Sequence, residues 1–112
     1  MAYHPESPYA ITKVAKEMYC KTFFNLYGLP TIGLRYFNVY GPRQDPQWAY
    51  AAVIPRWIAA AMKNQDLPLN GEGNQTRDFT YVDDVVAINI QALESDEPES
   101  RWKWYNVCYG DR

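Results

Sequence analysis

The segment from Ser7 to Gly28 constrains the fold more than any other part of the 112-residue chain. Ser7 is a favourable N-cap, Pro8 suits the first helical position, and Gly28 suits the left-handed residue that ends a helix. These signals predict a helix of about twenty residues. Tyr9 and Lys13 are expected to be neighbours on one side of it. A second group of residues recurs at helical spacing and predicts a buried stripe along the helix. It comprises Ile11, Ala15, Met18, Thr22 and Leu26.

A strand is expected after this helix, because residues 31–37 form a short β-rich run with too few residues for another helix. Its apolar character suits an interior strand of a parallel sheet. Residues 38–48 contain Gly41 and two prolines, and they predict a long loop at the carboxyl end of the strand. Such loops form ligand crevices in open α/β sheets.

The rest of the chain continues to alternate between helical and strand patterns. Pro55 and the alanines after it predict a second helix from residue 53 to about residue 65. Further elements are expected at 67–70 (a short strand), 71–74 (a turn), 77–82 (a strand), 85–93 (a helix), 95–101 (a polar surface linker) and 104–108 (a strand). This alternation, without a glycine-rich nucleotide loop, predicts an α/β organisation whose first half is absent.

Composition argues against several classes of function. The chain is 47% hydrophobic but has no apolar run of membrane-spanning length and no start like a signal peptide, so we expect a soluble protein without a membrane partner. A formal net charge of -2 provides no basic field for nucleic acid. Cys20 and Cys108 are far apart and His4 is the single histidine, so we expect a cytoplasmic protein with two reduced thiols and no metal site.

Tyr9 and Lys13 are the candidate catalytic pair. Four-residue spacing on a helix places a phenol and an ammonium on one face, where the positive charge favours a phenolate that can act as a base. The spacing alone is weak evidence, because the chain has ten tyrosines and such a pair arises readily by chance. On spacing alone, a packed Tyr9 beside a solvated Lys13 is the better interpretation.

The wider context changes this balance. Residues 7–17 (SPYAITKVAKE) closely resemble the active-site helix of the extended short-chain dehydrogenases/reductases, the NAD-dependent epimerase/dehydratase family, and residues 34–43 (LRYFNVYGPR) resemble their next strand and loop. The resemblance continues through the segments 50–55, 70–73, 76–84 and 105–107. Within the family, residues 43–55 look most like UDP-N-acetylglucosamine 4-epimerases.

The resemblance implies a Rossmann-like α/β fold, of which residues 1–112 would be a partial domain with an incomplete parallel sheet and substrate-binding elements. It implies NAD as the cofactor and a UDP-sugar as the substrate. Tyr9 would be the general base and acid, and Lys13 would contact the nicotinamide ribose. Tyr36 and Phe37 resemble residues that pack beside the nicotinamide, although a buried strand end is an alternative interpretation of both.

The substrate-binding residues implied by the resemblance lie further along the chain. Asn38 resembles a side chain that contacts the substrate phosphates, and Arg77 matches a diphosphate-binding arginine whose planar fork suits two oxygens. For Asn38 the alternative is a buried strand end, and for Arg77 it is an ion pair with Asp78 or a surface acid. Val53, Ile54 and Asn70 resemble the walls of a uracil site, with core packing as the alternative.

The resemblance also implies parts that these residues do not supply. They include an upstream half with a glycine-rich turn and a Ser or Thr of the catalytic triad, a role for which Ser7 is not a candidate because it caps the helix. Asp83 and Asp84 are expected to cap the third helix rather than to act in catalysis. Because these parts are missing, we expect the isolated chain to be inactive. The resemblance also implies that the parent enzyme is a homodimer.

The sequence leaves three functions open for the parent protein. The first is a nucleotide-sugar 4-epimerase. The second is a 4,6-dehydratase or decarboxylase of the same family. The third is a truncated, non-catalytic remnant that binds nucleotide sugars.

Overall fold

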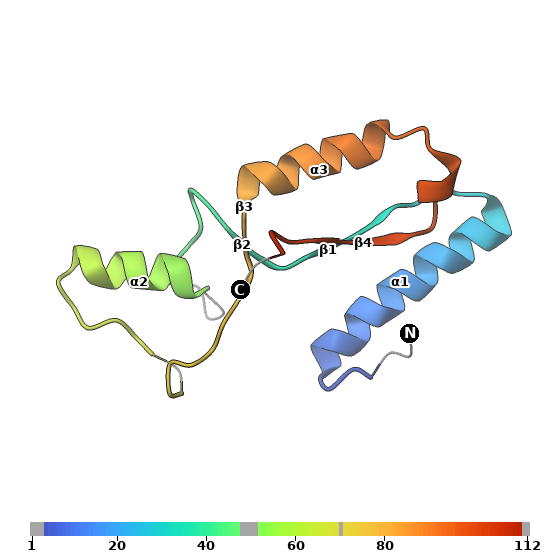
Figure 1. Cartoon of the computed structure of the whole chain (residues 1–112). Coiled ribbons are helices and arrows are strands. Elements are labelled where there is room, and N and C mark those ends of the chain that lie inside the picture. Colours follow the sequence, from blue (N-terminus) through green and yellow to red (C-terminus); the bar gives the residue numbers. More distant parts are fainter. Residues whose placement is uncertain (1–3, 48–51, 70, 111–112) are drawn as a thin grey trace. The chain divides into compact units, whose positions relative to one another are not determined.

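The computed structural model describes residues 4–47, 52–69 and 71–110 (Figure 1). Helices and strands alternate along the chain, which confirms the predicted α/β class. The elements are α1 (Pro8–Tyr27), β1 (Gly33–Tyr36), β2 (Asn38–Tyr40), α2 (Val53–Met62), β3 (Phe79–Tyr81), α3 (Val82–Glu94), the short 3₁₀ helix η1 (Pro98–Ser100) and β4 (Trp104–Val107). They fall into two compact units, the first drawn from residues 1–35 and 92–105 and the second from residues 36–91 and 106–112.

Helix α1 in the first unit begins and ends where its capping residues predict. The Ser7 side chain accepts a hydrogen bond from the backbone N–H of Ala10 at 3.1 Å, and Pro8 follows in the first turn. Gly28 adopts the left-handed conformation at φ 65°, and its N–H donates to the Phe24 carbonyl. These local contacts satisfy backbone groups that a helix leaves unpaired at its ends.

The predicted buried stripe of α1 is wrong, because no residue of this helix is buried. Ile11, Met18 and Leu26 are all more than half exposed. Other positions of α1 contact the rest of the first unit. The Glu17 carboxylate accepts two hydrogen bonds from Arg35 of β1, each at 2.6 Å, and the Phe24 ring lies 6.3 Å from that of Trp102. The side of α1 that contacts its unit therefore carries a paired carboxylate, Glu17, and not the apolar stripe that periodicity predicts.

The strands form two pairs. β1 pairs with β4, and β2 pairs with β3 in parallel, with Asn38 opposite Phe79 and Tyr40 opposite Tyr81 (Figure 1). The Tyr40 ring packs at 5.4 Å from Tyr81 and edge-on at 6.3 Å from Phe79. The long loop predicted from residue 38 is therefore wrong at its start, because residues 38–40 find a partner strand some forty residues later, which local sequence does not reveal.

Three other predicted boundaries need correction. Helix α2 ends at Met62, earlier than expected, because Asn64 turns to φ 53° and the N–H of Gln65 donates to the Ala60 carbonyl in the last turn. Residues 67–69 form no strand. Pro68 has no backbone N–H to donate to a ladder, and its carbonyl accepts instead from the indole of Trp57 at 2.8 Å. The strand expected at 77–82 is limited to β3.

Asp83 and Asp84 lie inside the first turn of α3, which begins at Val82, so neither is the predicted cap. Both carboxylates remain at the helix end where the macrodipole favours negative charge. The two aspartates can therefore still stabilise the start of α3, although neither occupies the capping position. The turn expected at residues 71–74 is present, with both of its glycines at positive φ.

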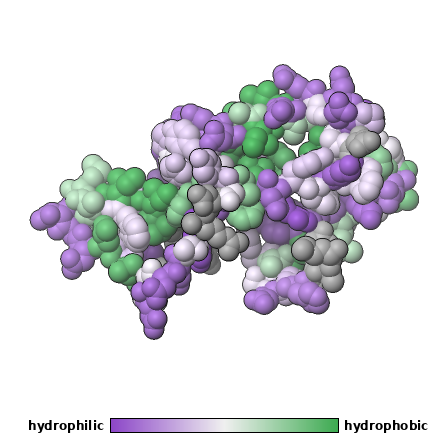
Figure 2. Space-filling view, viewed as in Figure 1, coloured by the Kyte–Doolittle hydropathy of each residue, from purple (hydrophilic) through white to green (hydrophobic). Residues whose placement is uncertain are grey.

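Little apolar surface is buried within the described residues. The buried hydrophobic residues among them are Ala60, Val85 and Val107. Large hydrophobic side chains remain exposed on α1, α2 and α3, and Figure 2 shows hydrophobic residues gathered around α2, where Ile58 and Met62 are 56% and 83% exposed. None of the helices described has both the length and the apolar character needed to cross a bilayer.

Gly33 provides a test of packing in the first unit. A Cβ at Gly33 would overlap the Trp104 ring, whereas a Cβ at Gly28 would meet nothing within 4 Å. In the complete gene product, Gly33→Ala is expected to lower the free energy of unfolding by about 3 kcal/mol through overpacking. Gly28→Ala is expected to cost only about 1 kcal/mol of left-handed strain. If chemical denaturation showed that both variants lose the same free energy of unfolding, the close approach of β1 to Trp104 would be contradicted.

Candidate functional site

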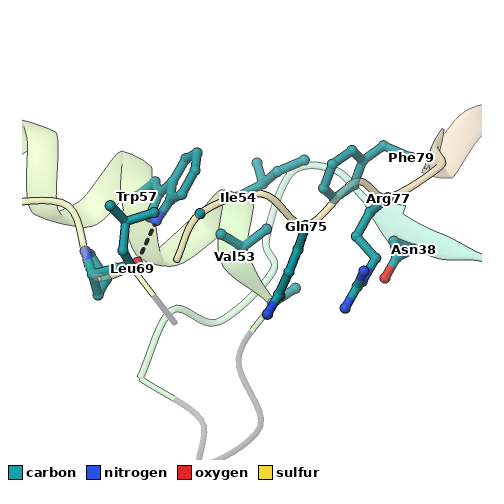
Figure 3. Close-up of a pocket in the computed structure, with 11 residues that line it drawn as sticks. Asn38, Val53, Ile54, Trp57, Leu69, Gln75, Arg77 and Phe79 are labelled. Carbon is teal, nitrogen blue, oxygen red and sulfur yellow. Dashed lines mark hydrogen bonds between the residues drawn. The ribbon is translucent and has the colours of Figure 1, made fainter. Parts of the chain in front are cut away.

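A pocket of about 350 Å³ lies in the second unit (Figure 3). Its walls come from the start of β2, the first turns of α2, the segment around residue 69 and the approach to β3. The lining residues used below are Asn38, Val53, Ile54, Trp57, Gln75 and Arg77. Parallel β2 and β3 place Asn38 directly opposite Phe79, and both line the pocket together with Arg77, which precedes β3 by two residues.

One end of the pocket is polar. Figure 3 shows the side chains of Arg77 and Asn38 next to each other, with the amide of Gln75 pointing to the same side. The Asn38 amide donates to the carbonyl of Asp78 at 3.0 Å, and Arg77 donates one hydrogen bond to the Thr76 carbonyl at 2.7 Å. A guanidinium has five N–H groups, so Arg77 keeps donors for a ligand. A cation beside two amides suits an anion with several oxygens.

The other end of the pocket is mainly apolar. Val53 and Ile54, in the first turn of α2, are half-buried and line the wall together with Trp57 and Leu69. The indole N–H of Trp57 donates to the Pro68 carbonyl at 2.8 Å, which ties α2 to the segment that carries Leu69 (Figure 3). Apolar walls joined to a few polar groups are typical of small-molecule sites, and this end suits a flat ring.

Tyr9 and Lys13 belong to the first unit and lie one turn apart on α1. The Lys13 Nζ is 4.8 Å from the centroid of the Tyr9 ring, close enough for a cation–π contact. Tyr9 is 70% exposed. The packed interpretation of Tyr9 is therefore wrong within the described residues, and the phenol remains accessible for chemistry beside a positive charge.

Tyr36 and Phe37 lie where β1 gives way to β2, and they are 46% and 42% exposed. A buried strand end does not describe them. The hydroxyl of Tyr36 donates to Oδ1 of Asn89 at 2.8 Å, while the Asn89 amide donates to the Val85 carbonyl of the same helix. α3 thus fixes the direction of the Tyr36 ring through a side chain that the sequence did not single out.

The structure brings four of the predicted substrate-binding residues together in one pocket, namely Asn38, Val53, Ile54 and Arg77. Asn70 lies outside the described residues. Reasoning from the sequence missed Trp57 and Gln75, which also line the pocket. Trp57 carried a usable signal, because it follows Val53 by four positions and so shares its helix face. Gln75 carried none, since it lies in an irregular segment.

Comparison with known proteins identifies the class to which this α/β chain belongs. Residues 1–108 match the family model described as the NAD dependent epimerase/dehydratase family. The chain belongs to that family, which confirms the resemblance and NAD as the cofactor of the class.

Particular relatives point to enzymes that act on UDP-sugars. A putative UDP-glucose 4-epimerase of Methanocaldococcus jannaschii is 49% identical over 90 residues, covering 80% of this chain and 29% of that protein. A UDP-N-acetyl-alpha-D-glucosaminuronate decarboxylase of Bacillus cytotoxicus is 49% identical over 86 residues, covering 77% of this chain and 26% of the relative. This chain therefore spans less than a third of the length of these relatives.

The fold of this chain is also similar to that of a solved structure. The UDP-N-acetylglucosamine 4-epimerase from Methanobrevibacter ruminantium, in complex with UDP-N-acetylmuramic acid, is 44% identical with a TM-score of 0.89. The match covers 97% of this chain and 34% of that protein. The arrangement of helices and strands described above is therefore similar to that in a member of the family.

Proposed function

We propose that this chain is part of an NAD-dependent nucleotide-sugar 4-epimerase acting on UDP-N-acetylglucosamine. The observation that carries the nucleotide-sugar class is the pocket of the second unit, with Arg77 and Asn38 at its polar end and Val53, Ile54 and Trp57 at its apolar end. A diphosphate requires cationic and amide donors, and a pyrimidine requires apolar walls. Asn70 is proposed as a further contact of the base.

The roles proposed for α1 follow from the phenol and ammonium on its exposed face. Tyr9 would accept the proton of the sugar 4-hydroxyl and later return it, and Lys13 would favour the phenolate while contacting the nicotinamide ribose. When bound beside these residues, NAD would supply reversible hydride transfer at the sugar C4, without net oxidation of the sugar. The residues present fit the nicotinamide end of the cofactor, because Tyr9 and Lys13 are accessible and Tyr36 and Phe37 expose ring surface.

Epimerisation is the preferred reaction because the solved UDP-N-acetylglucosamine 4-epimerase is 44% identical over nearly the whole chain. Decarboxylation of a UDP-linked uronic acid is the second candidate, since the decarboxylase relative is 49% identical over 86 residues. The proposed homodimer is supported by the exposed apolar residues Ile11, Met18 and Leu26 of α1. The two free thiols, Cys20 and Cys108, support the proposed cytoplasmic location.

The reaction is tested directly with the complete gene product. Incubation with NAD and UDP-N-acetylglucosamine is expected to yield UDP-N-acetylgalactosamine, separated by chromatography and identified by the sugar C4 proton in NMR. UDP-glucose serves as the competing substrate. Release of CO₂ from UDP-N-acetylglucosaminuronate, without epimerisation of UDP-N-acetylglucosamine or UDP-glucose, would reject the epimerase and support the decarboxylase. The 112 residues produced alone are expected to show no turnover, because so little apolar surface is buried among the residues that the structure describes.

Tyr9→Phe tests proton transfer. Loss of the phenolic hydroxyl is expected to lower kcat by about 10³-fold, the range typical of a general acid–base group. Affinity for UDP, measured by calorimetry, is expected to remain unchanged. Tyr19→Phe is the matched control, because Tyr19 lies on the same helix and is 68% exposed. If both variants retained wild-type kcat, Tyr9 would have no role in the chemistry.

Arg77→Gln tests the polar end of the pocket. Removing the guanidinium is expected to weaken UDP binding by about tenfold or more, since hydrogen bonds to charged groups contribute about 1.5–3 kcal/mol. Arg56→Gln is the control, because Arg56 is also exposed in the second unit but lines a different cavity. Equal affinities of the two variants in calorimetry would argue against a diphosphate at Arg77.

A further inference from the structure

Asp78 is a buried carboxylate that none of the roles above uses. It is only 8% exposed, and it lies between Arg77 and Phe79, both of which line the pocket. Aspartate is rarely buried to this degree unless its oxygens are hydrogen-bonded, because burial removes the water that stabilises the charge. Its partners therefore show what the side chain holds in place.

The Asp78 carboxylate binds the turn that follows β4. Oδ1 accepts from the backbone N–H of Tyr109 at 2.9 Å, and Oδ2 accepts from that of Gly110 at 2.7 Å. Hydrogen bonds to an ionised acceptor are about twice as strong as neutral ones. Gly110 adopts φ 89°, a left-handed conformation that favours glycine and lets successive N–H groups face one side chain.

The backbone carbonyl of Asp78 binds Asn38. It accepts from the Asn38 backbone N–H at 3.2 Å and from the Asn38 side-chain amide at 3.0 Å. Because a carbonyl oxygen only accepts, the second contact fixes which end of the amide faces Asp78. The side-chain oxygen of Asn38 and its second amide proton remain for the pocket.

The same arrangement keeps the charge of Arg77 available. The sequence alone allows Arg77 either to bind a ligand or to form an ion pair with Asp78. Both Asp78 oxygens instead accept from the backbone turn, and the ion pair found among the described residues joins Arg35 to Glu17. Arg77 can therefore offer its positive charge to an anion although an aspartate is adjacent in the chain.

The geometry points to Asp78 as a positioning residue for substrate: by holding the turn at Tyr109 and Gly110, it fixes the backbone that orients Asn38 and presents Arg77. This inference rests on the proposed function, in which these two side chains bind the diphosphate of a UDP-sugar. Asp78 itself lies outside the set of pocket-lining residues. Its effect is expected in substrate affinity rather than in proton transfer at Tyr9.

The test uses Asp78→Asn in the complete gene product with NAD present. The amide has nearly the same size, but its nitrogen cannot accept from a backbone N–H, so one of the two turn contacts is lost. The KM for UDP-N-acetylglucosamine and the Kd for UDP are expected to rise about tenfold, with kcat and the Kd for NAD within about twofold of wild type. Hydrogen exchange at the Asn38 amide is expected to accelerate.

Thr80→Val is the matched control. Thr80 is 6% exposed on β3, and its hydroxyl donates to the Val107 carbonyl at 3.5 Å, so the change also weakens a buried link to β4. It is expected to lower the thermal midpoint without changing KM. Gly110→Ala is the second Asp78 test, because it strains the turn while a Cβ there meets nothing within 4 Å. If Asp78→Asn does not fold, the KM of Gly110→Ala tests the positioning role by itself.

The outcomes separate the two proposals. A tenfold rise in KM for Asp78→Asn or Gly110→Ala, but not for Thr80→Val, supports the positioning role. Wild-type KM in both turn variants, or an equal rise in the control, overturns it. If wild-type protein binds no UDP, the proposed function fails, and exchange at Asn38 then decides whether Asp78 positions that residue. Unchanged exchange in both turn variants overturns the inference in that case as well.

Discussion

The second unit depends on the hydrogen bonds of one buried aspartate. Asp78 joins the start of β2, the start of β3 and the turn after β4, three segments that are widely separated along the chain. Its carboxylate is stabilised by two backbone N–H groups, and its carbonyl accepts twice from Asn38. The pocket wall formed by Asn38 and Arg77 is therefore a consequence of how a buried charge is satisfied.

The chemistry proposed for the protein is divided between its two units. Tyr9 and Lys13 are held by a helix that depends on its own caps, Ser7 and Gly28. The pocket instead depends on contacts between distant segments, including the Trp57 indole on the Pro68 carbonyl. The proposed proton transfer thus relies on local sequence, whereas the proposed substrate recognition relies on tertiary packing. Membership of the NAD dependent epimerase/dehydratase family accounts for both in one enzyme class.

Local signals predicted local structure well. The bounds of α1 follow from Ser7, Pro8 and Gly28, because capping hydrogen bonds form between residues close in sequence. Predictions failed where the answer depended on a distant partner. β2 is a strand because it pairs with β3, and the face of α1 that contacts its unit carries Glu17 because Arg35 lies opposite. Periodicity alone indicated Ile11 and Met18 for that face, and both are exposed.

The sequence by itself determined the alternation of helices and strands, the shared helix face of Tyr9 and Lys13, and the resemblance to the family. Only the tertiary structure decided that Asn38, Val53, Ile54 and Arg77 share one pocket, that Trp57 and Gln75 join them, and that Asp78 serves the turn rather than Arg77. The physical reason is the range of the interactions. Helix caps and side-chain periodicity act over a few residues, whereas strand pairing and the satisfaction of a buried carboxylate require segments that meet only in the folded chain.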